Sequence, residues 1–214
     1  MLHWAPSVNS GGALSFLDQV LTMTEQCLLA IHRPVRPQTV DQQLSTQERQ
    51  EVGRLMRINH VGEVCAQGLY LGAECAAKST KVAKMMNESR QEEIPHMQWL
   101  ERRLAQLEGR VSYGLPAWFS ASWVLGYVAG LAGDQWSLGF VAETEKQVVL
   151  HLEDHLSRLP KHDTESHRVL IKILNEELAH QHEAEEMGAR QLPNGIQSAM
   201  ALAAEGMRRV VRWL

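Results

Sequence analysis

The chain of 214 residues lacks the features that mark several large classes of protein. Its three cysteines, Cys27, Cys65 and Cys75, include no C-x-x-C pair, which disfavours a disulfide framework or a cysteine zinc site and suits a reducing cytoplasm. The net charge is −4, without the basic excess expected for a nucleic-acid partner. Residues 1–13 have neither a basic start nor an apolar core, so no secretory signal is expected.

Strand patterns are missing as well. No stretch alternates convincingly between apolar and polar residues, whereas almost every stretch has helical periodicity. The composition, 44% hydrophobic and 21% charged, is that of a globular protein long enough to bury a substantial core. The sequence therefore predicts an all-α fold.

Prolines, glycines and capping residues divide the helical pattern into segments. Ser45-Thr46-Gln47-Glu48 is typical of a capping box and predicts the start of a long helix. Long helices are expected at about 46–78, 80–107, 134–160 and 164–190, after an amphipathic helix at about 14–31. This pattern predicts a ferritin-like four-helix bundle with extra N-terminal, crossover and C-terminal helices. We expect residues 1–40 to form the N-terminal helix and linker, and residues 41–214 to form the ferritin-like domain.

The expected crossover, residues 115–132, has no charged residue and is a borderline membrane span by length. The last 15 residues form a second amphipathic pattern, in which Arg208, Arg209 and Arg212 lie opposite an apolar face. Two interpretations of this C-terminal pattern remain open: a helix that lies on an anionic bilayer, or a helix that caps the bundle.

The pattern Glu-Glu-x-x-His occurs twice, ending at His96 and at His180. Residues i and i+3 share a helix face, so Glu93 pairs with His96 and Glu177 pairs with His180. Glu92 and Glu176 are expected on solvated faces. A single Glu-x-x-His is usually a solvated pair, but two such faces turned toward each other supply four ligands of a two-metal carboxylate site.

Two further glutamates complete such a site. Glu63 lies among apolar residues, and Glu145 lies on an apolar stripe, whereas Glu143 points about half a turn away. Glu63 precedes Glu93 by 30 residues and Glu145 precedes Glu177 by 32, so two helical hairpins would bring all four to similar depth. Because the two halves must meet, we expect that the crossover does not span the membrane.

The candidate metal ligands are therefore Glu63, Glu93, His96, Glu145, Glu177 and His180. Carboxylates bridge hard cations and imidazole suits iron, so this set favours two iron ions per chain. No catalytic residue is expected beyond the di-iron site. Tyr70, seven residues after Glu63, shares its face and is a candidate to line the site, while His60 either supports a ligand or packs in the core.

These residues resemble a known family. The segment Arg57-Ile58-Asn59-His60-Val61-Gly62-Glu63, the two Glu-x-x-His pairs, Thr144-Glu145, and His151-Leu152-x-x-His155-Leu156 together are similar to the Coq7 family of demethoxyubiquinone hydroxylases, in its bacterial form. The similarity extends from about residue 40 to the C-terminus. The resemblance implies the same six iron ligands, with Glu93 and Glu177 as the bridging pair.

The resemblance also implies an activity and a location. A di-iron monooxygenase of ubiquinone biosynthesis would hydroxylate the ring of 2-polyprenyl-3-methyl-6-methoxy-1,4-benzoquinol, using O2 and an external electron donor. This substrate resides in the bilayer, so we expect a peripheral protein on the cytoplasmic side of the cell membrane, with other ubiquinone-biosynthesis proteins as partners. Two alternatives are a ferritin-like iron-binding protein and a membrane lipid-binding scaffold with a structural metal site.

Overall fold

A computed structural model describes residue 21 and residues 39–213. Within residues 39–213 the chain forms six helices and no strand, which confirms the all-α prediction. The helices are α2 (Thr46–Ala76), α3 (Thr80–Gln106), α4 (Leu115–Ala132), α5 (Asp134–Arg158), α6 (Thr164–Glu186) and α7 (Asn194–Val211). The expected N-terminal helix at residues 14–31 lies outside the described residues.

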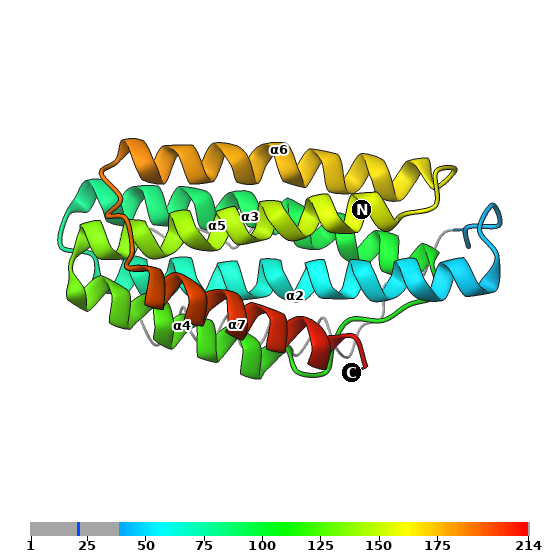
Figure 1. Cartoon of the computed structure of the whole chain (residues 1–214), viewed down its shortest axis with the longest axis horizontal. Coiled ribbons are helices and arrows are strands. Elements are labelled where there is room, and N and C mark those ends of the chain that lie inside the picture. Colours follow the sequence, from blue (N-terminus) through cyan, green and yellow to red (C-terminus); the bar gives the residue numbers. More distant parts are fainter. Residues whose placement is uncertain (1–20, 22–38, 214) are drawn as a thin grey trace, which may run out of the picture.

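Four helices form the body of the molecule. Figure 1 shows α2, α3, α5 and α6 side by side along the longest axis, with α4 and α7 against the α2 side. The hairpin α2–α3 and the hairpin α5–α6 meet through contacts of α2 with α5 and of α3 with α6. The two halves of the internal repeat therefore belong to one helical bundle.

The helix ends follow local chemistry. The expected capping box is present, because the Ser45 side chain accepts from the backbone N–H of Glu48 while the Glu48 carboxylate accepts from the backbone N–H of Ser45. Helix α6 ends at Glu186, four residues earlier than predicted. Gly188 follows with a φ of 95°, a left-handed conformation that ends helices and that glycine adopts without strain.

Helix α4 packs along α2 through glycines. A Cβ atom on Gly68 or Gly72 of α2 would collide with the backbone of α4, and a Cβ on Gly126 would collide with the backbone at Leu69. By length and composition α4 is long and apolar enough to cross a membrane. Its outward face leaves four apolar side chains about half exposed: Val124, Leu125, Val128 and Leu131.

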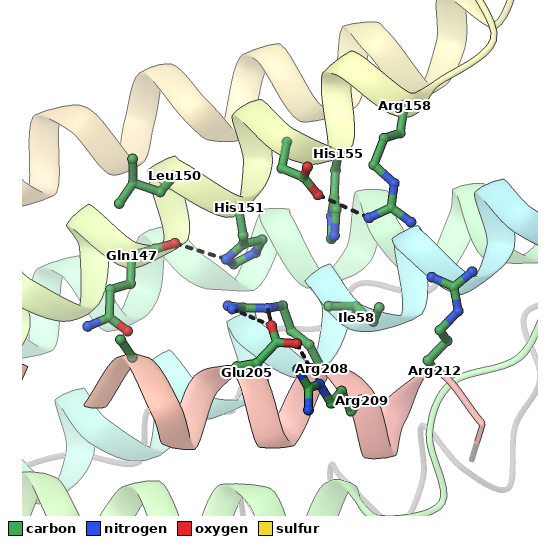
Figure 2. A pocket seen from close by; sticks show the side chains of 12 residues that line it. Ile58, Gln147, Leu150, His151, His155, Arg158, Glu205, Arg208, Arg209 and Arg212 are labelled. Atoms are coloured by element: carbon green, nitrogen blue, oxygen red, sulfur yellow. Dashed lines mark hydrogen bonds and ion pairs between the residues drawn. The ribbon is translucent and has the colours of Figure 1, made fainter. Parts of the chain in front are cut away.

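Helix α7 packs on α2 and α5 and buries Val211, and most of its other side chains are exposed, so it is compatible with both interpretations. Its basic residues do not all face outward. A cavity of about 480 Å³ lies between α5 and α7. Figure 2 shows that Arg208, Arg212, His151 and His155 are among the side chains that line it. The guanidinium groups there are held by carboxylates, as Arg208 is by Glu205 at 2.9 Å.

The hydrophobic core is divided lengthwise. One cluster gathers the start of α2 and the end of α3 and includes Met56 and Leu100. A second gathers the end of α2 and the start of α3 and includes Tyr70 and Met86. A third joins α2 to α4 and includes Val61 and Phe119. The middle of the bundle, between the first two clusters, holds polar residues.

Candidate metal centre

The six predicted ligands all lie in this middle region and are all buried, with side chains no more than 4% exposed. Glu63 comes from α2 and Glu145 from α5, while α3 and α6 each contribute one glutamate and one histidine. Helical spacing places each Glu-x-x-His pair on one face, and the apolar residues around it turn that face inward. Four helices thus deliver four carboxylates and two imidazoles to one place.

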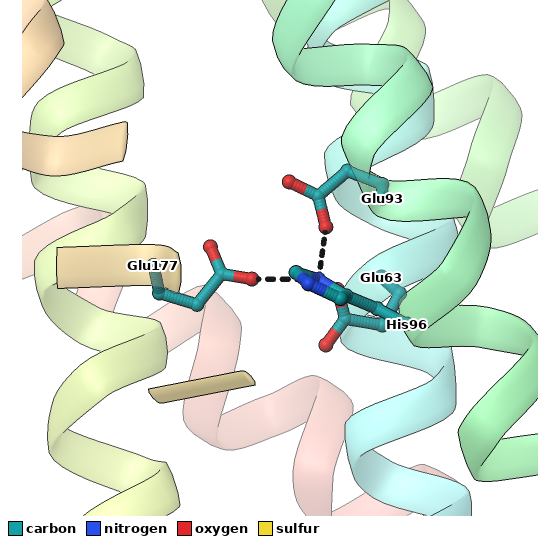
Figure 3. A group of neighbouring side chains, drawn as sticks. All are labelled: Glu63, Glu93, His96 and Glu177. Atoms are coloured by element: carbon teal, nitrogen blue, oxygen red, sulfur yellow. Dashed lines mark hydrogen bonds and ion pairs between the residues drawn. The ribbon is translucent and has the colours of Figure 1, made fainter. Parts of the chain in front are cut away.

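Three of the other five gather around His96, as Figure 3 shows: Glu63, Glu93 and Glu177. The Nδ1 atom of His96 lies 2.9 Å from Oε2 of Glu93, 3.1 Å from Oε1 of Glu177 and 3.5 Å from Oε2 of Glu63. Ligand atoms of these four residues all lie within 4.8 Å of one another. Nδ1 carries at most one hydrogen, so it cannot satisfy three carboxylates at once.

The second imidazole faces the same two glutamates. The Nδ1 atom of His180 lies 3.2 Å from Oε1 of Glu93 and 3.5 Å from Oε2 of Glu177. Glu93 and Glu177 therefore each present one oxygen to His96 and the other oxygen to His180. This is the arrangement that two carboxylates need in order to bridge two cations.

Glu145 enters the cluster from the other side. Its pKa is raised above the ordinary value by burial and then by the charge of Glu177. Its Oε1 atom accepts a hydrogen bond of 2.9 Å from the hydroxyl of Tyr70, which is fully buried. Tyr70 therefore lines the site, and Glu143 is not part of it, since Glu143 bonds to Lys146 and Gln147.

Glu92 and Glu176 are not merely solvated, which corrects the sequence prediction. Oε2 of Glu176 lies 2.5 Å from Nε2 of His96, and Oε2 of Glu92 lies 2.8 Å from Nε2 of His180. Both carboxylates stay partly exposed, as predicted, but each accepts from the histidine of the other helix. The doubled glutamate in both copies was the available signal, because the residue before each ligand sits at the edge of the same face.

His60 does not take part in the cluster. Its Nε2 atom lies 3.2 Å from Oε1 of Glu101 on α3. One residue earlier, Asn59 accepts a hydrogen bond of 2.8 Å from Nδ1 of His155. These contacts join α2 to α3 and to α5 one turn before Glu63.

The buried carboxylates and imidazoles shift one another's pKa values. Burial raises the pKa of Glu63, and the neighbouring charges of Glu177 and Glu93 raise it further. Burial would lower the pKa of His180, but the neighbouring carboxylates of Glu177 and Glu93 raise that pKa to about 12. The contacts with His180 and His96 in turn hold the pKa of Glu177 below its ordinary value despite burial. The cluster has a strong affinity for positive charge.

Several buried atoms of the cluster have no hydrogen-bond partner. They are Oε1 of Glu93, Oε2 of Glu145, both carboxylate oxygens of Glu177, and Nδ1 of His180. Leaving such atoms unpaired in a core is costly, and all of them belong to carboxylate or imidazole groups, which are metal donors. The residues present therefore fit a bound metal.

Known proteins are similar to this chain over most of its length. The family model described as "Ubiquinone biosynthesis protein COQ7" matches residues 50–211. A 3-demethoxyubiquinol 3-hydroxylase of Xanthomonas euvesicatoria is 47% identical over 172 residues, which cover 80% of this chain and 79% of the relative. Relatives with the same description are 44% identical in Nitrosomonas europaea, over 81% of this chain and 84% of the relative. The relative in Xylella fastidiosa is also 44% identical, over 92% of this chain and 94% of the relative.

Proposed function

The chain belongs to the COQ7 family of ubiquinone biosynthesis proteins, and from that membership we propose that it is a 3-demethoxyubiquinol 3-hydroxylase. Its relatives with that activity are 44–48% identical over most of both chains. This identity favours the enzyme over the iron store and the lipid-binding scaffold that the sequence left open. The reaction is a monooxygenation: a ring C–H and O2, with two electrons and two protons from outside, become C–OH and water.

The proposal assigns two iron ions to the six-residue cluster, within a bundle of the ferritin-like type. The observation that carries this assignment is the position of Glu93 and Glu177, each with one oxygen toward His96 and one toward His180. Glu63 and His96 would serve one ion, and Glu145 and His180 the other. When bound, iron supplies the activation of O2 that protein side chains lack.

The chain's own residues set the conditions for that chemistry. Burial of all six ligands between two apolar clusters keeps bulk water away from the cluster. Glu176 and Glu92 accept from Nε2 of the two histidines, which leaves each Nδ1 free to bind a cation. The histidines are thereby held in one tautomer and one orientation.

We propose a peripheral location on the cytoplasmic side of the cell membrane, where a polyprenyl substrate resides. The apolar outward face of α4 supports this, together with Leu202 and Trp213 near α7, which are 74% and 75% exposed. Half-exposed Val and Leu side chains along the second half of a helix suit a bilayer interface better than water. Other proteins of ubiquinone biosynthesis are the expected partners on that surface.

The test combines metal content with product formation. The purified chain should contain two irons and should convert a short-chain 3-demethoxyubiquinol to the hydroxylated product, seen as a mass gain of one oxygen, when O2 and a chemical reductant are supplied. Glu177→Ala should abolish conversion, whereas Glu186→Ala on the exposed side of α6 should not. Full conversion by Glu177→Ala, or by a metal-free chain, would contradict the proposal.

A further inference from the structure

The two halves of the internal repeat are not equal. Seven residues after Glu63, α2 carries Tyr70, and seven residues after Glu145, α5 carries Leu152. Residues seven apart lie on the same helix face, so the two positions are equivalent in the repeat. One of them holds a hydrogen-bond donor and the other does not.

Tyr70 reaches across to the glutamate of the opposite half. Its hydroxyl donates to Oε1 of Glu145 at 2.9 Å, and its ring stands edge-on to His180, with ring centroids 6.4 Å apart. The side chain is fully buried. Oε2 of Glu145 is buried too and has no hydrogen-bond partner. Of the two oxygens of Glu145, one is therefore engaged and one is left for a metal.

Leu152 does nothing comparable for Glu63. It is fully buried and packs in the apolar cluster with Met56 and Leu100. Oε2 of Glu63 instead lies 3.5 Å from Nδ1 of His96, within the compact group of four ligands. Glu145 and His180 are outside that group. His180 still lies 3.2 Å from Glu93, but Glu145 takes its hydrogen bond from a phenol, so the Glu63–His96 half is the more compact of the two.

We propose that Tyr70 is a positioning residue that commits Glu145 to bind metal through Oε2 alone, and that the Glu145–His180 position is the second of the two to fill. This inference rests on the proposed di-iron function. A carboxylate that binds through both oxygens would have to give up the bond from Tyr70, in a core that offers the hydroxyl no water as a substitute. The hydrogen bond therefore favours one binding mode at one metal and leaves the other metal unaffected.

The test is a metal titration of the full chain after removal of metal by a chelator. Fe2+ is added without oxygen, and the heat of binding is recorded. The wild type should bind two ions in two steps of unequal affinity. Tyr70→Phe removes only the hydroxyl. It should lower the affinity of the second binding step about tenfold, within the range seen when a group that supports a metal ligand is removed. The first step should change less than twofold.

A spectroscopic signature separates positioning from general damage. With Co2+ in place of Fe2+, the visible absorption of the second ion should differ between wild type and Tyr70→Phe, and that of the first ion should not. Tyr113→Phe is the matched control. Tyr113 is exposed, and its hydroxyl accepts a hydrogen bond from Arg110. It should leave both steps and both spectra unchanged.

Each outcome decides a different point. Two equal steps in the wild type, or a Tyr70→Phe variant in which both steps or neither step weakens, would overturn the inference. If Tyr70→Phe fails to fold, the wild-type titration alone still tests the inequality of the two positions. A wild type that binds fewer than two ions would count against the di-iron assignment itself.

Discussion

Nε2 of His96 on α3 lies 2.5 Å from Oε2 of Glu176 on α6, and the reciprocal contact joins His180 to Glu92 at 2.8 Å. Each Glu-Glu-x-x-His copy therefore supplies a pair of candidate metal ligands and, in addition, a hydrogen-bond acceptor for the histidine of the other copy. The two contacts tie α3 to α6 on the outer side of the cluster. Both glutamates of each copy therefore contact the cluster. The second faces its centre, and the first bonds to a histidine at its edge.

Replacing Glu176 with alanine should weaken metal binding without emptying the site. The imidazole of His96 would lose the acceptor that orients it, and the loss of such a partner usually lowers metal affinity about 10- to 100-fold. Isothermal titration with Fe2+ under nitrogen measures this. Glu186→Ala on the same helix, where Glu186 is exposed and pairs with exposed His182, should leave the affinity unchanged. Equal effects in the two variants would contradict the role assigned to Glu176.

Removing the metal should destabilise the fold. Without cations, Glu63 and Glu145 have to hold protons in the core, as their raised pKa values indicate. A ligand present at 100 times its Kd stabilises the native state by about 2.7 kcal/mol per site. Calorimetric melting after treatment with a chelator, and again after Fe2+ is restored, should show this difference. The melting temperature of a Glu177→Ala variant should rise much less when Fe2+ is added.

Stability should also fall in mild acid because of His155. Burial, together with nearby His151 and Arg158, lowers the pKa of His155 from 6.5 to about 3. The unfolded chain therefore binds a proton below pH 6.5 that the folded chain does not, so this contribution is present above pH 6.5 and is lost as the pH falls toward 3.

Urea unfolding at pH 7 and pH 5 measures the effect. Relative to His155→Gln, the wild type should lose about 2 kcal/mol between these two pH values. His182→Gln is the control, since that side chain is 71% exposed, and its pH dependence should match that of the wild type. A wild type and a His155→Gln variant with parallel pH profiles would show that His155 is not the group responsible.

The close packing of α4 on α2 should be sensitive to a single methyl group. Gly126→Ala places a Cβ atom against the backbone at Leu69 and should cost about 1–3 kcal/mol of unfolding free energy. Gly206→Ala on α7 meets nothing within 4 Å and should be neutral or stabilising. Urea unfolding of both variants tests the contrast, and an unchanged Gly126→Ala protein would refute it.

A charge on the outward face of α4 should release the protein from membranes. Val128 is 58% exposed in the middle of that face, and Val128→Glu would place a carboxylate at the bilayer interface. Co-sedimentation with anionic phospholipid vesicles should fall several-fold. Leu178→Glu on α6, where the native side chain is 47% exposed, is the matched control and should still sediment. The two helices lie on opposite sides of the bundle in Figure 1.

Much of the fold follows from patterns within single segments. The capping box at Ser45 and the uninterrupted helical periodicity predicted α2 to within two residues, and the other bundle helices to within four. The apolar neighbours of Glu145 predicted that it, rather than Glu143, faces the core. These are properties of one helix at a time, governed by spacing along the chain.

What the sequence determined by itself is the set of six candidate ligands and the faces on which they lie, because i to i+3 spacing and apolar stripes are local. Only the tertiary structure decided which side chains meet across helices: Glu176 with His96, Glu92 with His180, and Tyr70 with Glu145. Those contacts depend on the rotation and register of one helix against another. Such variables are set by the packing of the whole core, so no single segment encodes them.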